Sequence, residues 1–233
     1  AERNPAADVE GADACRKICI LASLACGMEV KPEFVKTEGI TKITLQDVSY
    51  ANSYGCVIKL IARAKFNSKS DKDEIECIVS PAFVKKSSQL ASIDDVYNGV
   101  LIRGNATGDV VFYGKGAGKL PTASAVVGDI IDIAKNSSTS VSLTWEATDE
   151  NIVADYKETQ SEFYVRLSTQ NKDAEKEINH VFDDVKYITC KDAPANEYAF
   201  VTKKINEAVF ARKLVTLAEL DCTILGNIRL VDY

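Results

Sequence analysis

The strongest constraint on the fold is a helix that follows two backbone breakers and then becomes almost entirely apolar. Pro5 and Gly11 interrupt the backbone, and the pattern after them predicts a helix over residues 13–26. Beyond Lys17 this segment reads Ile-Cys-Ile-Leu-Ala-Ser-Leu-Ala-Cys. A helix that is apolar nearly all round is typical of a buried position. The sequence therefore predicts a buried helix with charged residues at its head.

Those charges form a pattern that suits proton transfer. Asp13 and Lys17 are one helical turn apart, and Glu2 and Asp8 lie just upstream. Three apolar residues share the face of Lys17: Ile20, Leu21 and Leu24. An ammonium group among apolar side chains is costly unless it is paired, and burial lowers its pKa. Three carboxylates around a half-buried lysine could hold a substrate ammonium and move a proton, although an i,i+4 pair of this kind is often only a surface ion pair.

Composition excludes several classes of function. The net charge is −6, which argues against nucleic-acid binding because phosphates need clustered Lys and Arg. No apolar run approaches the ~20 residues that span a bilayer, and residues 1–10 do not resemble a signal peptide. Seven scattered cysteines without a C-x-x-C pair predict reduced thiols in a cytoplasmic protein. His180 is the single histidine, so we expect no zinc site and no other metal.

The middle of the chain predicts a small sheet rich in antiparallel pairs. We expect short helices near residues 31–35 and before Ala51, a polar turn at 67–72 and a strand end at Pro81. The expected strands are 56–66, 74–80, 97–103 and 109–113. Residues 114–118 hold three glycines, Gly114, Gly116 and Gly118, before a helix expected over 122–134. Such a loop can bring the backbone close to a ligand at a helix N-terminus, or it can be a plain tight turn.

The last third predicts a second module. Residues 137–158 are mostly polar and indicate a linker, within which Trp145 could anchor a short strand. Residues 159–233 then predict strand, helix, two strands, helix and strand, which is a ferredoxin-like split βαβ pattern. The expected elements are 163–168, 172–182, 185–190, 198–203, 206–220 and 223–230. The fold class is therefore α/β (α+β), with a largely antiparallel mixed sheet followed by a βαββαβ domain.

Three motifs in order resemble the homoserine dehydrogenase family. The first comprises Glu2, Asn4-Pro5, Asp8-Val9-Glu10-Gly11, Asp13-Ala14 and Lys17. The second is Thr37-Glu38-Gly39-Ile40-Thr41, and the third runs from Gly104 through Gly118 to Asp129. The resemblance implies that residues 1–136 form that family's substrate domain. It also implies that 159–233 are an ACT-like regulatory domain.

The family resemblance also assigns roles. It implies that Lys17 is the proton donor, that Glu2 and Asp13 bind substrate, and that Asp8 sets their electrostatics. The implied reaction interconverts aspartate semialdehyde and homoserine with NAD(P). Gly118 matches the family glycine that touches the nicotinamide cofactor, and Gly114 and Gly116 belong to the same loop.

No G-x-G-x-x-G follows an N-terminal strand, so we expect the family's nucleotide-binding domain to be absent and this fragment to be inactive. A second catalytic lysine, a monovalent-cation site and the choice between NAD and NADP cannot be assigned. The helix 122–134, which packs on that domain in the family, would lose its partner. We therefore expect a homo-oligomer, a dimer or larger.

The ACT-like tail suggests threonine as an effector, but residues 169–173 lack the glycine that such sites use, which predicts weak binding. Two rival readings stay open at this point. One is a non-catalytic amino-acid-binding regulatory protein built on the tail. The other is a dehydrogenase of similar fold that acts on a different amino acid.

Overall fold

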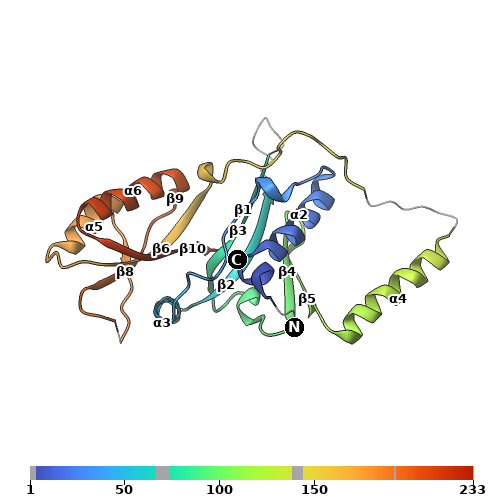
Figure 1. Ribbon diagram of the computed structural model, residues 1–233, viewed down its shortest axis with the longest axis horizontal. Helices are drawn as coiled ribbons and strands as arrows, with labels where there is room; N and C mark the ends of the chain where they lie inside the picture. The colour runs from blue at the N-terminus through green and yellow to red at the C-terminus, as the bar shows by residue number, and fades with distance from the viewer. Residues whose placement is uncertain (1–3, 67–73, 138–143, 192, 233) are drawn as a thin grey trace. The chain divides into compact units, whose positions relative to one another are not determined.

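The computed structural model describes residues 4–66, 74–137, 144–191 and 193–232 (Figure 1). The chain forms two compact units. One contains Ala1–Lys85 and Trp145–Tyr233, and the other contains Lys86–Thr144. The first unit is a mixed sheet with helices on both faces, and most of its strand pairs are antiparallel, as expected.

Two glycines delimit the first long helix. Helix α1 (Ala6–Val9) ends before Gly11, whose φ of +83° allows the sharp turn into α2 (Ala12–Cys26). Gly27 ends α2 with a φ of +76°, a common C-terminal arrangement. The buried residues of α2 follow one stripe: Cys15, Cys19, Ala22 and Ser23. The helix therefore has one buried face.

The expectation that α2 is buried nearly all round is wrong for this chain. Ile20, Leu21 and Leu24 are 51%, 40% and 42% exposed. They share a face with Lys17, so the apolar side chains and the lysine together form an exposed surface of the helix. A helix packed against one sheet buries only the stripe that faces it.

The sheet begins with a long antiparallel pair, as predicted. Strand β2 (Cys56–Phe66) pairs with β3 (Ile75–Lys85) from Cys56–Lys85 to Phe66–Ile75. The turn expected at 67–72 lies outside the described residues. Alternation puts Leu60, Ala62 and Val79 on the face that packs against α2.

Pro81 does not end β3, contrary to the prediction. The carbonyl of Val79 accepts a hydrogen bond from the Glu38 amide, so this edge of β3 faces β1 (Lys36–Thr37). Two residues later, Pro81 faces the same edge. There β1 has already ended, and the pairing with β10 (Thr223–Val231) starts at Ala82. The missing N–H therefore interrupts no ladder bond, and the strand continues.

Short elements connect these strands. Residues 31–35 hold only a 3₁₀ turn, η1 (Pro32–Phe34), after which the chain enters β1. Helix α3 (Leu45–Ser53) starts with a reciprocal cap between Thr44 and Asp47.

The C-terminal segment has the predicted order of elements. They are η3 (Tyr156–Glu158), β6 (Gln160–Ser168), α5 (Ala174–Phe182), β7 (Lys186–Tyr187), β8 (Glu197–Val201), β9 (Ile205–Asn206), α6 (Glu207–Glu219) and β10. The strands lie in the order β10-β6-β8-β7. Each βαβ unit is thus split by an inserted strand, which is the ferredoxin-like arrangement. The strand expected over 185–190 is shorter, and β9 was not predicted.

The two sequence modules share one sheet. Strand β10 pairs in parallel with β3 through Arg229–Ala82, Leu230–Phe83 and Val231–Val84. Residues 145–158 of the expected linker belong to the same unit, in which Val153 is buried and bridges to Ile75. Near Trp145 there is a single bridge, Met28 to Glu146, in place of a strand. The compact units therefore differ from the division into 1–136, 137–158 and 159–233, which stays a prediction about sequence modules.

Three clusters of buried hydrophobic side chains lie in the described part of the first unit. The core under α2 includes Cys15, Cys19, Cys77 and Val79. Helices α5 and α6 cover one face of the C-terminal strands, where Phe163, Val165 and Leu167 are buried (Figure 1). Helix α3 contributes Tyr50 and Ala51 to a third core, which contains Tyr164 from the opposite face of β6.

The second unit is a hairpin followed by a helix. Strands β4 (Tyr97–Gly104) and β5 (Gly108–Lys115) pair throughout, after the turn η2 (Gln89–Ser92). Helix α4 (Lys119–Lys135) covers the predicted 122–134 and has no buried residue. Among the described residues, no helix is long and apolar enough to cross a membrane.

Candidate functional site

The acidic turn, which comprises residues 8–11 and precedes α2, is formed by local backbone contacts. The Asn4 side chain accepts a hydrogen bond from the Ala6 amide at 3.1 Å, at the first residue of α1. The amide of Cys15 donates to the Gly11 carbonyl at 2.9 Å, so α2 starts immediately after the turn. Asp8 lies on α1 and Asp13 in the first turn of α2. The local sequence thus places two carboxylates on either side of one glycine.

Asp13 and Lys17 form the pair that the spacing predicts. Lys17 Nζ lies 2.7 Å from Asp13 Oδ2, and the two side chains are 58% and 42% exposed. The expectation of a half-buried lysine among apolar side chains is therefore not met in this chain. Its ammonium is oriented by Asp13 and stays accessible to a small molecule.

The remaining predicted carboxylates are not drawn into this pair. Asp8 is exposed and has no ion pair among the described residues. Glu2 lies outside the described residues. Of the four predicted polar residues, the structure brings Asp13 and Lys17 into contact and places Asp8 on the neighbouring turn.

The second sequence motif, Thr37–Thr41, packs against the backbone of the acidic turn. The amide of Ile40 donates to the Val9 carbonyl at 2.8 Å. A Cβ on Gly39 would lie only 2.3 Å from that same oxygen and 2.6 Å from Glu10 Cα, so only glycine fits. A Cβ on Gly11 would in turn meet Thr37 Cγ2 at 3.2 Å. Thr37 to Thr41 therefore pack directly against the segment that carries the carboxylates.

Glu38 of that motif is held by a residue from the far end of the chain. Arg229 on β10 donates from Nη1 to Glu38 Oε2 at 2.7 Å and from Nε to Glu207 Oε1 at 2.6 Å. Burial alone would raise the pKa of Glu38, but the hydrogen bonds and charge of Arg229, with help from Lys36, outweigh it and lower the pKa. Burial alone would lower the pKa of Arg229, but the hydrogen bonds and charges of Glu207 and Glu38 outweigh it and raise the pKa.

A second buried cluster joins α3 to β6 and β8. Arg166 donates to Asp47 at 2.8 Å, to Glu197 at 3.1 Å and to Thr44 at 3.0 Å. Tyr164 also donates to Asp47, at 3.1 Å. Burial would raise the pKa of Asp47, but Arg166 and Thr44 outweigh it and lower the pKa. Because Arg166 and Asp47 compensate each other and Glu197 contacts the same guanidinium group, this cluster has the features of a structural connection.

Neither arginine cluster was predicted from the sequence. Their signals were present: a lone arginine inside an apolar strand, at Arg166 and Arg229, must be paired if that strand is buried. Thr44 and Asp47 have the spacing of a capping pair. The carboxylate partners are 31 to 191 residues distant from these arginines, apart from Glu207 at 22, so no local pattern could identify them.

The glycine loop lies in the second unit. Gly118 has a φ of +124°, a backbone conformation that side chains rarely adopt, and it precedes α4. At Gly116 a Cβ would overlap the Asn98 side chain at 1.5 Å. Gly114 has open space around it. The loop thus leaves backbone exposed before a 17-residue helix, which could hold an anionic group of a cofactor.

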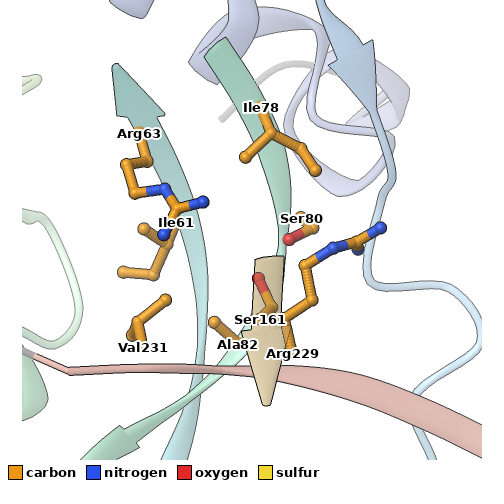
Figure 2. A pocket seen from close by; sticks show the side chains of 8 residues that line it. All are labelled: Ile61, Arg63, Ile78, Ser80, Ala82, Ser161, Arg229 and Val231. Carbon is orange, nitrogen blue, oxygen red and sulfur yellow. The ribbon is translucent and has the colours of Figure 1, made fainter. Parts of the chain in front are cut away.

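The cavity shown in Figure 2 does not compete with the Asp13–Lys17 pair as a substrate site. The cavity in Figure 2 has a volume of about 10 Å³ and is lined by Ile61, Arg63, Ile78, Ser80, Ala82, Ser161, Arg229 and Val231. That volume is about enough for one water molecule and excludes a substrate. Among the described residues, no group of His, Cys, Asp and Glu is arranged to hold a metal ion.

Comparison with known proteins gives the family. The family model described as homoserine dehydrogenase matches residues 1–131, which is more than half of the chain. The chain belongs to the homoserine dehydrogenase family. This match contains all three motifs, and it does not favour the alternative of a non-catalytic regulatory protein.

Curated homoserine dehydrogenases are similar over the same segment. The enzyme of Synechocystis is 50% identical over 133 residues, which are 57% of this chain and 31% of that protein. The enzyme of Helicobacter pylori is 41% identical over 167 residues, which are 72% of this chain and 38% of that protein. The chain thus spans about a third of the length of these relatives.

A solved structure is similar over the whole chain. A homoserine dehydrogenase from Thiobacillus denitrificans matches with a TM-score of 0.84 and 28% identity. The match covers 100% of this chain and 56% of that one. The mixed α/β fold, including the C-terminal strands, is therefore a fold of homoserine dehydrogenases.

Proposed function

We propose that this chain supplies the substrate-binding part of a homoserine dehydrogenase, which interconverts L-aspartate 4-semialdehyde and L-homoserine. The observation that carries the proposal is the 2.7 Å contact between Lys17 Nζ and Asp13 Oδ2, at the start of a helix inside the family-matched segment. Because Asp13 orients an accessible ammonium group, the pair can serve a substrate that needs one proton.

The proposed step uses Lys17 as general acid. Lys17 Nζ gives a proton to the aldehyde oxygen as the carbonyl carbon receives a hydride, and in reverse it takes the proton of the hydroxyl group. A nicotinamide cofactor, NAD or NADP, supplies or accepts that hydride when bound. Asp13 and Glu2 hold the ammonium and hydroxyl groups of the amino acid, and Asp8 adds negative charge beside them. Gly114, Gly116 and Gly118 let the backbone approach the cofactor.

The test replaces Lys17 in a protein that joins this chain to a nucleotide-binding domain. Lys17→Met should lower kcat by about 100-fold or more, as loss of a general acid does. Arg16→Met is the matched control, because Arg16 is the exposed neighbour on the same helix and has no proposed role. If Lys17→Met keeps near-normal turnover, Lys17 is only a member of a surface ion pair.

The isolated chain provides a second test. We expect no detectable turnover with saturating cofactor and homoserine, because the sequence contains no dinucleotide fingerprint after an N-terminal strand. Measurable turnover by these 233 residues would contradict the proposal that the cofactor is held largely elsewhere. We further propose that the ACT-like segment serves mainly in subunit pairing, in a cytoplasmic homo-oligomer that binds threonine weakly.

A further inference from the structure

We propose that Arg229 is a positioning residue, which ties the Thr37–Thr41 segment, and through it the acidic turn at residues 8–11, to the first turn of α6. This inference deepens the proposed function, because it rests on Asp8 and Asp13 belonging to the substrate site. It makes the geometry of that site depend on the C-terminal module.

The guanidinium group of Arg229 is held between two carboxylates. Its guanidinium group makes paired contacts with two carboxylates: Nη1 and Nη2 with Glu38 at 2.7 and 3.3 Å, and Nε and Nη2 with Glu207 at 2.6 and 2.9 Å. Figure 2 shows this group pointing away from Arg63. Arg229 and Glu207 are 9% and 6% exposed. A planar fork held on two sides has little freedom to move.

The two carboxylates that Arg229 binds belong to different parts of the chain. Glu207 is the first residue of α6, and its amide donates to the Thr159 carbonyl at 3.0 Å. Glu38 lies immediately after β1, and its amide donates to the Val79 carbonyl at 2.8 Å. Arg229 thus joins a helix of the C-terminal module to the second sequence motif. Without the arginine, two neighbouring carboxylates would repel each other.

Backbone contacts of the two residues after Glu38 connect it to the acidic turn. Gly39 lies against Val9 and Glu10 so closely that no side chain fits, and the Ile40 amide donates to Val9 at 2.8 Å. A displacement of Glu38 therefore shifts Gly39 and Ile40, which contact the backbone of Val9. That backbone carries Asp8 and leads through Gly11 into the helix of Asp13.

Arg166 differs from Arg229 in the segments that it connects. Arg166 is also a buried arginine between two carboxylates on a C-terminal strand, but its partners are Asp47 and Glu197. None of its hydrogen bonds reaches residues 37–41. Both arginines join the modules, and only Arg229 does so at the segment that braces the acidic turn. Arg166→Met is therefore a matched control for Arg229→Met.

The experiment measures amide hydrogen exchange of Ile40 in this chain, without substrate or cofactor. Arg229→Met should lower the protection of the Ile40 amide at least tenfold, and Arg229→Lys, which keeps the charge but not the fork, should lower it less. Arg166→Met also lowers the global stability, so it should reduce the protection of the Ile40 amide no more than that of the other buried amides of this unit, whereas Arg229→Met should reduce it selectively. A loss at Ile40 that only matches the other buried amides in Arg229→Met, or unchanged protection in that variant, would overturn the proposal. If Arg229→Met does not fold, Arg229→Lys and Glu38→Gln against Arg166→Lys decide in the same way.

A kinetic arm separates this inference from the proposed function. In the protein joined to a nucleotide-binding domain, Arg229→Lys should raise KM for homoserine at least fivefold with kcat within twofold. That split is expected because the Lys17–Asp13 pair on α2 is retained while the turn before it shifts. An unchanged KM would overturn the positioning role. Failure of the Lys17→Met test with an altered KM would instead count against the proposed proton donor.

Discussion

Arg166 on β6 and Asp47 on α3 form a buried ion pair at 2.8 Å between two segments that are 119 residues apart in sequence. The side chains are 8% and 2% exposed. Thr44 and Glu197 accept further hydrogen bonds from the guanidinium group. This pair fixes the helix that follows the second motif to the C-terminal strands.

Removing Arg166 should be strongly destabilising. Arg166→Met leaves the Asp47 carboxylate buried without its partner, and the loss of one member of such a pair costs about 3–5 kcal/mol. Urea denaturation followed by circular dichroism measures the change. Arg103→Met is the control, because Arg103 pairs with Asp109 on an exposed hairpin and is 55% exposed. Its loss should cost far less, because an exposed ion pair contributes little to stability, and a similar cost for both variants would contradict the prediction.

The stability of the fold should fall in acid. Glu38 and Asp47 have pKa values below the ordinary 4.5 and 3.8, because Arg229 and Arg166 outweigh the opposing effect of burial. A lowered pKa adds stability that is fully present above the unfolded value and is lost as pH falls through the folded value. The free energy of unfolding should therefore decrease below about pH 4.5, measured by urea titration at successive pH values. Asp47→Asn should flatten this dependence, and an unchanged slope would argue against the assignment.

The buried thiols should resist alkylation. Burial, with the neighbouring Cys15, raises the pKa of Cys19 and of Cys77 to about 12, and the thiolate is the reactive form. Mass spectrometry after iodoacetamide treatment at pH 8 should find both unmodified in the folded chain, whereas all seven cysteines should react in denaturant. Their raised pKa values also predict that stability declines as pH rises from 9 towards 12. Rapid modification of Cys77 under native conditions would contradict this.

Threonine binding at the first strand-to-helix loop of the C-terminal module should be weak or absent. The amide of Asn171 donates to Thr169 Oγ1 at 3.1 Å and that of Asp173 to Asn171 Oδ1 at 2.9 Å. Two of the backbone donors that an amino-acid carboxylate could use in this loop are thus already occupied. Calorimetric titration of the chain with threonine checks this. A micromolar dissociation constant that is abolished by Asn171→Ala would show that the loop is an effector site.

The chain should associate in solution. Helix α4 exposes a row of apolar side chains, among them Val126, Ile130 and Ile133 at 53%, 59% and 71%, and such surfaces commonly mark contacts. Light scattering at high concentration should give a mass at least twice that of one chain. The double variant Ile130→Lys/Ile133→Lys should lower that mass if α4 contributes. A monomer mass for the unaltered chain would contradict the prediction.

The sequence alone determined the local elements and the polar pair of the site. Backbone breakers at Pro5 and Gly11, alternation over 56–66 and the i,i+4 spacing of Asp13 and Lys17 act over a few residues, so their structural outcome can be predicted from pattern. The order of elements in the C-terminal segment followed for the same reason. These features depend on periodicity and turn chemistry, which are written in consecutive residues.

Tertiary structure decided which surfaces are covered and which distant residues meet. Ile20, Leu21 and Leu24 are apolar, yet they stay exposed because only one stripe of α2 faces the sheet. Pro81 remains inside β3 because the neighbouring strand changes from β1 to β10 at that point. The joining of β10 to β3 and the meeting of Arg229 with Glu38, 191 residues away, arise from long-range pairing. Such contacts depend on distant segments of the first unit joining in one sheet, and no window of sequence contains both partners.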